Sequence, residues 1–292
     1  MACPGPRTLR MGRLGYQSDA QAILNVRHKS LEISTRSLQA APTIRYPAYE
    51  APGVRGPDEV YVQPATTLMQ IENEFYSSIR PKRVMQPDER PLHALWARGV
   101  EYVEVRCLDL DPFEPLGISG STMAFLDACQ MHSLLSPDVQ DSPDEGARSA
   151  RNFERTAATG RMPGLRLERG SGDALRIDWA GGLLAAIELI AVALHAAHHN
   201  DRYREALDSA FKSMAEPQML PSARVMDGVG RDFDGTFTAF ALARSRTFKR
   251  KLPDGPWSAV MDRVHRATAA ESMQTQQRME AKGQIPFEDF QC

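Results

Sequence analysis

Two stretches of the sequence carry many charged side chains at positions where the apolar spacing indicates buried strands. The first is QIENEFYSSIRPKR, residues 70–83, and the second is VEYVEVRCLDLDPF, residues 100–113. Successive side chains of a β-strand point to opposite faces of the sheet. In the second stretch this alternation puts Glu104 and Arg106 together on one face. The opposite, apolar face is formed by Val103, Val105 and Cys107.

A glutamate and an arginine on one strand face allow more than one interpretation. They could form a neutralising pair on a solvated sheet face, because surface ion pairs are common and contribute little to stability. They could instead line an active site, in which the carboxylate holds Mg²⁺ and the arginine binds a phosphate or a substrate carboxylate through two hydrogen bonds. The residue types and spacing alone leave these two interpretations open.

The first stretch has the same ambiguity and adds a third interpretation. Alternation from residue 71 predicts a strand face that carries Glu72, Glu74 and Tyr76. The basic run IRPKR that follows, with Arg80, Lys82 and Arg83, could be a nucleic-acid patch. The run has no interleaved aromatic residues and the chain has a net charge of -2, so we expect no nucleic-acid partner.

Composition indicates a soluble globular protein of one or two domains. The chain has 292 residues, of which 42% are hydrophobic and 25% charged. The four cysteines are scattered without CxxC spacing, which predicts neither a zinc site nor a redox motif and fits a cytoplasmic location. No apolar run follows the basic N-terminus, so no signal peptide is expected. The apolar segment 181–197 contains Glu188 and predicts a buried helix rather than a membrane span.

The elements that must position the charged stretches lie in the first part of the chain. We expect a helix over 18–40 and then a proline-rich connection over 41–65 without long regular elements. Two strands are predicted, at 67–77 and 101–110. The segment PLHALWARG between them predicts a short helix that ends at Gly99.

The second part of the chain reads as mostly helical. Ser119 or Ser121 can cap a helix that runs to Leu135. Its predicted apolar face comprises Phe125, Ala128, Cys129, His132 and Leu135. Further helices are expected at 147–158, 183–199, 203–215, 236–249 and 257–282, with a loop at 138–146, an irregular segment at 160–173 and a glycine-containing loop at 221–235.

Early strands followed by helices favour an α+β fold. We divide it into a sheet region, 1–115, and a helical region, 116–292, which form one continuous domain.

Four motifs closely resemble the bacterial glutamate–cysteine ligase family, also called γ-glutamylcysteine synthetase. They are LRMGRLGYQS, TTLMQIENEFYSSIRPKR, GVEYVEVRCLDLDPFEPLGI and SARVMDGVG, in this order from about Arg7 to the C-terminal region. The resemblance implies a glutamine-synthetase-like fold, in which antiparallel strands form a funnel-shaped site with helices packed outside. The chain would then hold a partial antiparallel sheet of this kind and a packed helical C-terminal part.

The resemblance also implies the chemistry. Members of the family use ATP to phosphorylate the γ-carboxylate of glutamate, and the amine of cysteine then attacks the acyl phosphate to give γ-glutamylcysteine. This is the first step of glutathione biosynthesis. The transfer needs cations against the phosphate charge, hence Mg²⁺ and arginines. ATP, Mg²⁺, glutamate and cysteine are therefore the expected ligands.

Matching the motifs residue by residue implies roles for individual side chains. Glu104 resembles a magnesium-binding carboxylate, and Arg106 resembles the arginine that contacts the transferred phosphate or glutamate. Arg10, Tyr16 and Tyr76 resemble the group that lines the cysteine pocket, where an arginine suits the carboxylate and tyrosine hydroxyls fix the orientation. Four weaker candidates lie in the matching motifs, without an assigned role: Glu72, Arg80, Lys82 and Arg83.

The sequence departs from the family pattern at its start. Family members carry a substantial N-terminal portion before the motif that matches LRMGRLGY, and that portion supplies further acidic metal ligands and part of the nucleotide site. We therefore expect a chain that lacks this portion and has an unpaired sheet edge. The alternative to an active ligase is an inactive remnant, or a non-catalytic half that needs a partner chain.

Overall fold

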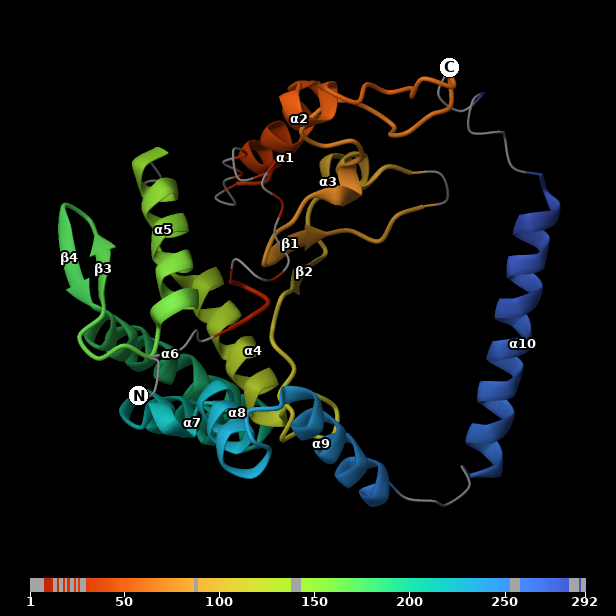
Figure 1. Cartoon of the computed structure of the whole chain (residues 1–292). Coiled ribbons are helices and arrows are strands. Elements are labelled where there is room, and N and C mark those ends of the chain that lie inside the picture. The colour runs from red at the N-terminus through yellow and green to blue at the C-terminus, as the bar shows by residue number, and fades with distance from the viewer. Residues whose placement is uncertain are drawn as a thin grey trace.

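The fold is known from a computed structural model of the whole chain (Figure 1). It describes residues 8–12, 15, 18, 20, 21, 24, 26, 30–86, 89–137, 143–252, 258–283 and 289. Helices dominate, and the strands form two small antiparallel sheets, β1–β2 and β3–β4. The predicted α+β class is confirmed. The division at residue 115 stays a prediction.

The elements of the first part are short. They are α1 (Leu31–Ala40), the 3₁₀ turn η2 (Ala41–Thr43), α2 (Pro47–Glu50), the 3₁₀ turn η3 (Glu72–Glu74), β1 (Ile79–Lys82), α3 (Pro91–Arg98) and β2 (Tyr102–Val105). The proline-rich segment 41–65 has no long regular element, as predicted. The helix predicted over 18–40 is confirmed only from Leu31, where the side chain of Ser30 accepts a hydrogen bond from the Ile33 N–H. Parts of 18–30 lie outside the described residues.

The second part consists mainly of helices. They are α4 (Gly120–Leu135), α5 (Pro143–Thr159), α6 (Arg176–His198), α7 (Arg202–Ala215), α8 (Pro221–Asp232), α9 (Phe237–Lys251) and α10 (Ala259–Ala281), with strands β3 (Arg166–Arg169) and β4 (Gly172–Leu175) before α6 and the 3₁₀ turn η4 (Pro217–Met219) before α8. Ser119 caps α4, since its hydroxyl accepts from the Thr122 N–H at 2.9 Å.

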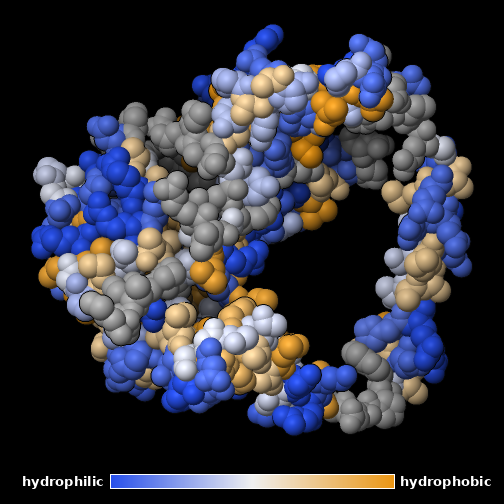
Figure 2. Space-filling model, viewed as in Figure 1, coloured by the Kyte–Doolittle hydropathy of each residue, from blue (hydrophilic) through white to orange (hydrophobic). Residues whose placement is uncertain are grey.

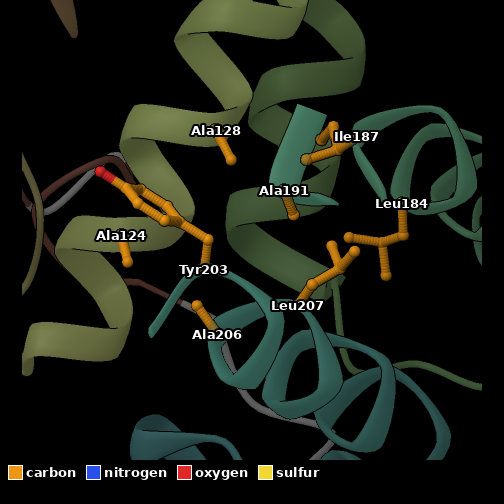
Figure 3. Packing of buried hydrophobic residues seen from close by; sticks show 8 residues of the cluster. All are labelled: Ala124, Ala128, Leu184, Ile187, Ala191, Tyr203, Ala206 and Leu207. Carbon is orange, nitrogen blue, oxygen red and sulfur yellow. The ribbon is translucent and has the colours of Figure 1, made fainter. Parts of the chain in front are cut away.

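The core of the helical part lies between α4, α6 and α7 (Figure 3). The small side chains Ala124 and Ala128 of α4 let this helix approach Tyr203 of α7 and Ile187 of α6 closely. Burial of a side chain such as Ile187, which is 0% exposed, contributes roughly 1.5–3 kcal/mol. The predicted apolar face of α4 is correct for Phe125, Ala128 and Cys129, which pack on this core.

Leu135 was also assigned to this face, and for it the prediction is wrong. The side chain is 65% exposed, at the last residue of α4 and outside the core cluster.

Helix α6 is long and apolar enough to cross a membrane by length and composition, and 17% of its apolar window is buried, so the predicted buried helix is correct for only part of its surface. Its buried residues pack against α4 and α7.

The strand predicted over 67–77 is wrong for most of its length. Thr67 forms one isolated bridge with Arg45, and residues 72–74 form the turn η3. The reason is that side chains, one of them distant in sequence, bond to the backbone groups that a strand ladder would use. The Glu74 carboxylate accepts from the Gln70 N–H, and the Gln21 side chain bonds to Glu74 O and to the Tyr76 N–H. The strand forms later, within the basic run.

The predicted strand 101–110 is confirmed in its first half and ends early. Cys107 has a φ of 62°, in the left-handed region, which an extended strand excludes. The side chain of Cys107 is nevertheless buried, as predicted. A left-handed non-glycine residue costs roughly 1–2 kcal/mol, so the surrounding contacts must impose this corner.

Three predictions of irregular structure are wrong in whole or in part. The loop predicted at 138–146 is helical from Pro143, where α5 begins, and 138–142 lie outside the described residues. Residues 166–175 form the hairpin β3–β4, whose two-residue turn is Gly170–Ser171, with Gly170 at a φ of 59°. Residues 221–232 form α8, which begins with a proline at its first position. Glycines favoured a loop in the sequence, but Gly228 serves packing, because a Cβ there would lie 3.1 Å from the Phe240 ring.

Helix α10 has no buried residue and lies apart from the other elements (Figure 1). Figure 2 shows a wide opening between α10 and the rest of the molecule, and apolar and polar residues are mixed over the visible face.

An ion pair ties the segment after β1 to the last turn of α3. Arg98 donates from both terminal nitrogens to the Glu89 carboxylate, at 2.7 and 2.6 Å, and also to Val84 O at 3.0 Å. The hydrogen bonds from Arg98, helped by the Gln86 N–H, lower the pKa of Glu89 to about 2. The same contact raises the pKa of Arg98. The pair thereby fixes the path from β1 through α3 to β2.

We predict that Glu89→Gln changes how stability depends on acidity. The pKa of Glu89 is lower in the folded chain, at about 2, than its ordinary value of 4.5. Its stabilising contribution is therefore complete above pH 4.5 and is lost as the pH falls toward 2. Urea unfolding between pH 6 and pH 2 should show a difference between wild type and Glu89→Gln that shrinks across this window. Glu154→Gln, an exposed carboxylate on α5, is the control. A difference that does not vary with pH would contradict the prediction.

Candidate functional site

The pairing of β1 with β2 brings four charged side chains to one face. Arg80 lies opposite Glu104, and Lys82 lies opposite Tyr102. Directly opposite residues of an antiparallel pair share a face, and so do residues two apart on one strand. Arg106 continues the Glu104 side of β2, and its N–H donates to Ser78 O at 2.7 Å. The face therefore holds Arg80, Lys82, Glu104 and Arg106 together.

Glu104 lies between two cations on this face. Its carboxylate is 3.5 Å from Lys82 Nζ and 3.6 Å from Arg106 Nε. The side chain of Glu104 is 40% exposed and that of Arg106 is 26% exposed, so both are reachable from solvent. With three cations and one carboxylate, the face has an excess of positive charge. Such a face suits phosphate or carboxylate groups of a ligand.

The predicted group changes in two ways. Lys82 and Arg80 were weak candidates from the sequence, and the register places both beside Glu104. Arg83 falls on the opposite face, where it contacts Glu101 at 3.6 Å and donates to Arg98 O at 3.0 Å. Arg83 therefore holds α3 against the strands and is not part of the polar face.

Glu72 likewise has a structural position. Its carboxylate is 2.5 Å from Arg90 and accepts from the Leu92 N–H, in the first turn of α3, at 3.3 Å. A carboxylate at a helix N-terminus satisfies an otherwise unpaired N–H and interacts favourably with the helix dipole. Glu72 thus anchors α3 and does not share a face with Glu104 as part of a strand.

The proposed cysteine-pocket residues are only partly described. Arg10 is exposed and lies beside the chain that leaves β2, with Nη1 donating to Leu108 O at 3.2 Å. The Tyr76 backbone N–H bonds to the buried Gln21 side chain at 2.8 Å. Tyr16 lies outside the described residues.

Sequence reasoning missed Asp109. Its two carboxylate oxygens accept from the backbone N–H groups of Leu9 and Arg10, at 3.1 and 3.0 Å. The signal was its place in the RCLDLDPF motif, at the end of the predicted strand 101–110.

Two surface pockets lie away from the polar face. One of about 580 Å³ is formed by α5 with the β3–β4 hairpin, and one of about 750 Å³ by α8, α9 and Phe113. Neither includes Glu104 or Arg106, so neither is the site that the charged strands form.

The polar face suits a magnesium ion that takes one ligand from this face and its other ligands from phosphates, water and other groups. Mg²⁺ takes six oxygen ligands and commonly draws one or two from protein carboxylates, with phosphates and water supplying the others. Glu104 is a partly exposed carboxylate among cations that would bind those phosphates. In the described ranges, no group of three or more His, Cys, Asp or Glu side chains could hold a metal. Glu104 can therefore hold one position of a shell that phosphates and other groups complete.

Solved structures first define the class of protein to which this fold and site belong. The chain superposes on a glutamate–cysteine ligase of Francisella tularensis, solved in complex with AMP, with a TM-score of 0.86 and 29% identity. The match covers 97% of this chain and 55% of that chain. A bifunctional glutathione synthetase of Pasteurella multocida has the same fold over 86% of this chain, with a TM-score of 0.61 and 17% identity.

Sequence comparisons then name the family. The glutamate–cysteine ligase family model matches residues 1–156. A glutamate–cysteine ligase of Janthinobacterium sp. is 41% identical over 98% of this chain, and one of Azotobacter vinelandii is 39% identical over 98%. The chain belongs to the glutamate–cysteine ligase family, as the resemblance implied. It spans about half the length of these relatives, 54% in both cases.

We predict that the two glutamates respond differently to substitution. Glu72→Gln removes the charge from the α3 N-terminus and should lower the free energy of unfolding by about 1 kcal/mol. Glu104→Gln removes a partly exposed carboxylate and should change it by less than about 0.5 kcal/mol. Denaturant unfolding of both variants measures this. Equal losses would mean that Glu104 also supports the fold.

Proposed function

We propose that this chain supplies part of the active site of an ATP-dependent ligase that joins the γ-carboxylate of L-glutamate to the amine of L-cysteine. The observation that carries the proposal is the β1–β2 register, which puts Arg80, Lys82, Glu104 and Arg106 on one face. Family membership supports the reaction type. Because the chain spans about half of its relatives, the whole reaction is assigned to it only as a proposal.

The reaction makes defined demands on that face. A γ-carboxylate oxygen of glutamate attacks the γ-phosphorus of ATP, and the bond from that phosphorus to ADP breaks. The cysteine nitrogen then attacks the acyl carbon, the carbon–oxygen bond to phosphate breaks, and the amine loses a proton. Negative charge is transferred in both steps, so fixed cations near the phosphate lower the barriers.

In this proposal the charges of the face have separate tasks. Arg106 and Arg80 donate hydrogen bonds to the transferred phosphoryl group or to glutamate, and Lys82 adds a point charge. Glu104 holds Mg²⁺ together with the nucleotide phosphates. When bound, Mg²⁺ would offset phosphate charge. Lys82 and Arg106 lie beside Glu104 and offset its charge.

The cysteine would bind at the end of the face. Arg10 lies beside Leu108, two residues beyond Arg106, and an arginine suits the cysteine carboxylate. Tyr76 and Tyr16 would orient the substrate through their hydroxyls. Glutamate, cysteine and ATP are the partners of this proposal, in the cytoplasm, with no role for nucleic acid or membrane.

A second candidate function rests on the edge of the sheet. Ser78 and Arg106 form a hydrogen-bonded pair, so Pro81 and Val103 form a non-bonded pair, and their backbone groups point outward. The outer edge of β1 is closed, since Pro81 has no N–H and the Ser77 hydroxyl donates to Ile79 O. Among the described residues, none bonds to the backbone of Val103 or Val105 on the outer edge of β2.

That open edge favours a chain that works as one part of a two-part ligase. A strand from the portion of the family fold that this chain does not span would pair with β2 and bring further carboxylates to Glu104. Alone, the chain would then be non-catalytic.

We predict that cysteine-dependent release of ADP depends on the polar face. The assay contains glutamate, cysteine and Mg-ATP. It is run with the chain alone and with the unmatched portion of the Janthinobacterium relative added as a second chain. Arg106→Gln should lower turnover at least about 100-fold, because it removes a donor to the developing charge. Arg263→Gln, an exposed arginine on α10, which lies apart from the polar face, should leave turnover within about threefold.

The outcomes separate the two functions. Turnover by the chain alone that Arg106→Gln abolishes supports the ligase and overturns the two-part alternative. Turnover only with the second chain would mean that the chain contributes to a ligase active site and does so as one part of a two-part enzyme. Folded protein without turnover in either mixture would overturn the ligase proposal.

A further inference from the structure

The corner after β2 holds the segment that contains Arg10. The Asp109 carboxylate accepts from two successive backbone N–H groups, those of Leu9 and Arg10, with one oxygen to each. The Leu108 carbonyl accepts from Arg10 Nη1 at 3.2 Å. In Figure 1 the N-terminal segment passes beside the chain that leaves β2. Two neighbouring residues therefore fix both the backbone and the side chain of Arg10.

The corner itself is held from both sides. On the strand side, Cys107 is buried with a left-handed backbone, and the Arg106 N–H bonds to Ser78 O. On the helical side, Arg244 of α9 donates to Pro112 O at 3.0 Å. The guanidinium of Arg224, from α8, lies 3.8 Å from the centre of the Phe113 ring. Asp109 therefore lies in a segment that other contacts hold in place, as a residue that positions another residue must.

The hydrogen bond from the Arg10 side chain to the corner uses one of the three guanidinium nitrogens. Of these nitrogens, Nη1 bonds to the corner, and in the described part of the chain no bond from Nε or Nη2 to the corner is seen. These two nitrogens form one of the forks that bind a carboxylate through two parallel hydrogen bonds. A fork that is already oriented loses less entropy when a ligand binds.

We propose that Asp109 is a positioning residue for substrate binding, which acts by holding Arg10 in register with Arg106. The inference rests on the proposed function, in which Arg10 binds the carboxylate of the amino-acid substrate. The spacing between the two arginines is set by the two residues from Arg106 to Leu108, because Leu108 O is the acceptor for Arg10. Asp109 thereby links the amine-substrate side of the site to its phosphate side.

Equilibrium binding of L-cysteine to the full chain under reducing conditions, followed by NMR titration, tests this inference. Asp109→Ala should weaken binding about tenfold, since it removes two charge-assisted hydrogen bonds that orient Arg10. Asp109→Asn keeps one acceptor oxygen and should restore part of the affinity. In a double-mutant cycle, Asp109→Ala should have no further effect once Arg10 is replaced by Ala, a result that a general loss of structure would not give.

Asp111→Ala is the matched control, because Asp111 lies in the same segment but its carboxylate accepts from the Phe113 N–H. It should leave affinity within about twofold. Trypsin cleavage after Arg10 gives a second readout that needs no ligand, and it should be faster in Asp109→Ala than in wild type or Asp111→Ala.

The failures are distinguishable. If Arg10→Ala leaves cysteine binding unchanged, or wild type does not bind cysteine, the proposed role of Arg10 fails. If Arg10→Ala weakens binding and Asp109→Ala does not, or if their effects simply add, the positioning role of Asp109 is overturned. Unchanged trypsin cleavage would contradict it as well.

Discussion

The pairing of β1 with β2 is the interaction on which the rest of the site depends. These strands have four residues each, yet their register decides which charges meet. A shift by one residue would move Arg80 and Lys82 to the other face, and Glu104 would lose its neighbours on β1. The register is held at one end by the Arg106–Ser78 hydrogen bond and at the other by the ties of Arg83, Glu89 and Arg98 to α3. A small sheet can therefore hold a defined charge pattern.

The glutamates near this sheet show that surroundings assign roles to identical side chains. Glu72 binds the N-terminus of α3, and Glu89 is held by both terminal nitrogens of Arg98. Both carboxylates complete structural contacts. Within the described residues, the contacts of Glu104 with Lys82 and Arg106 are longer, and its side chain stays partly exposed. Of these three glutamates, Glu104 is placed to release its contacts with Lys82 and Arg106 and bind a cation, while the two basic side chains bind a phosphate.

The sequence predicted the positions of the long apolar helices α4, α6 and α7 well, and strand alternation correctly placed Glu104 and Arg106 on one face. It failed where backbone groups bond to side chains, as at Glu74 and Gln21, and where a residue adopts an unexpected conformation, as at Cys107. Arg80 and Arg83 look equivalent in IRPKR. Only the partner strand, distant in sequence, separates them into a face residue and a brace for α3. Asp109 was missed because its partners lie about 100 residues away.

The most direct test of the central claim is an NMR measurement of nuclear Overhauser effects between the Hα protons of β1 and β2. Cα atoms of non-hydrogen-bonded antiparallel pairs are only about 4.5 Å apart, so their Hα protons give strong effects. The account predicts such effects between Ile79 and Val105 and between Pro81 and Val103. Effects that instead connect Arg80 or Lys82 with Val103 or Val105 would mean a shifted register. The four charged side chains would then not share a face, which would contradict the proposed site.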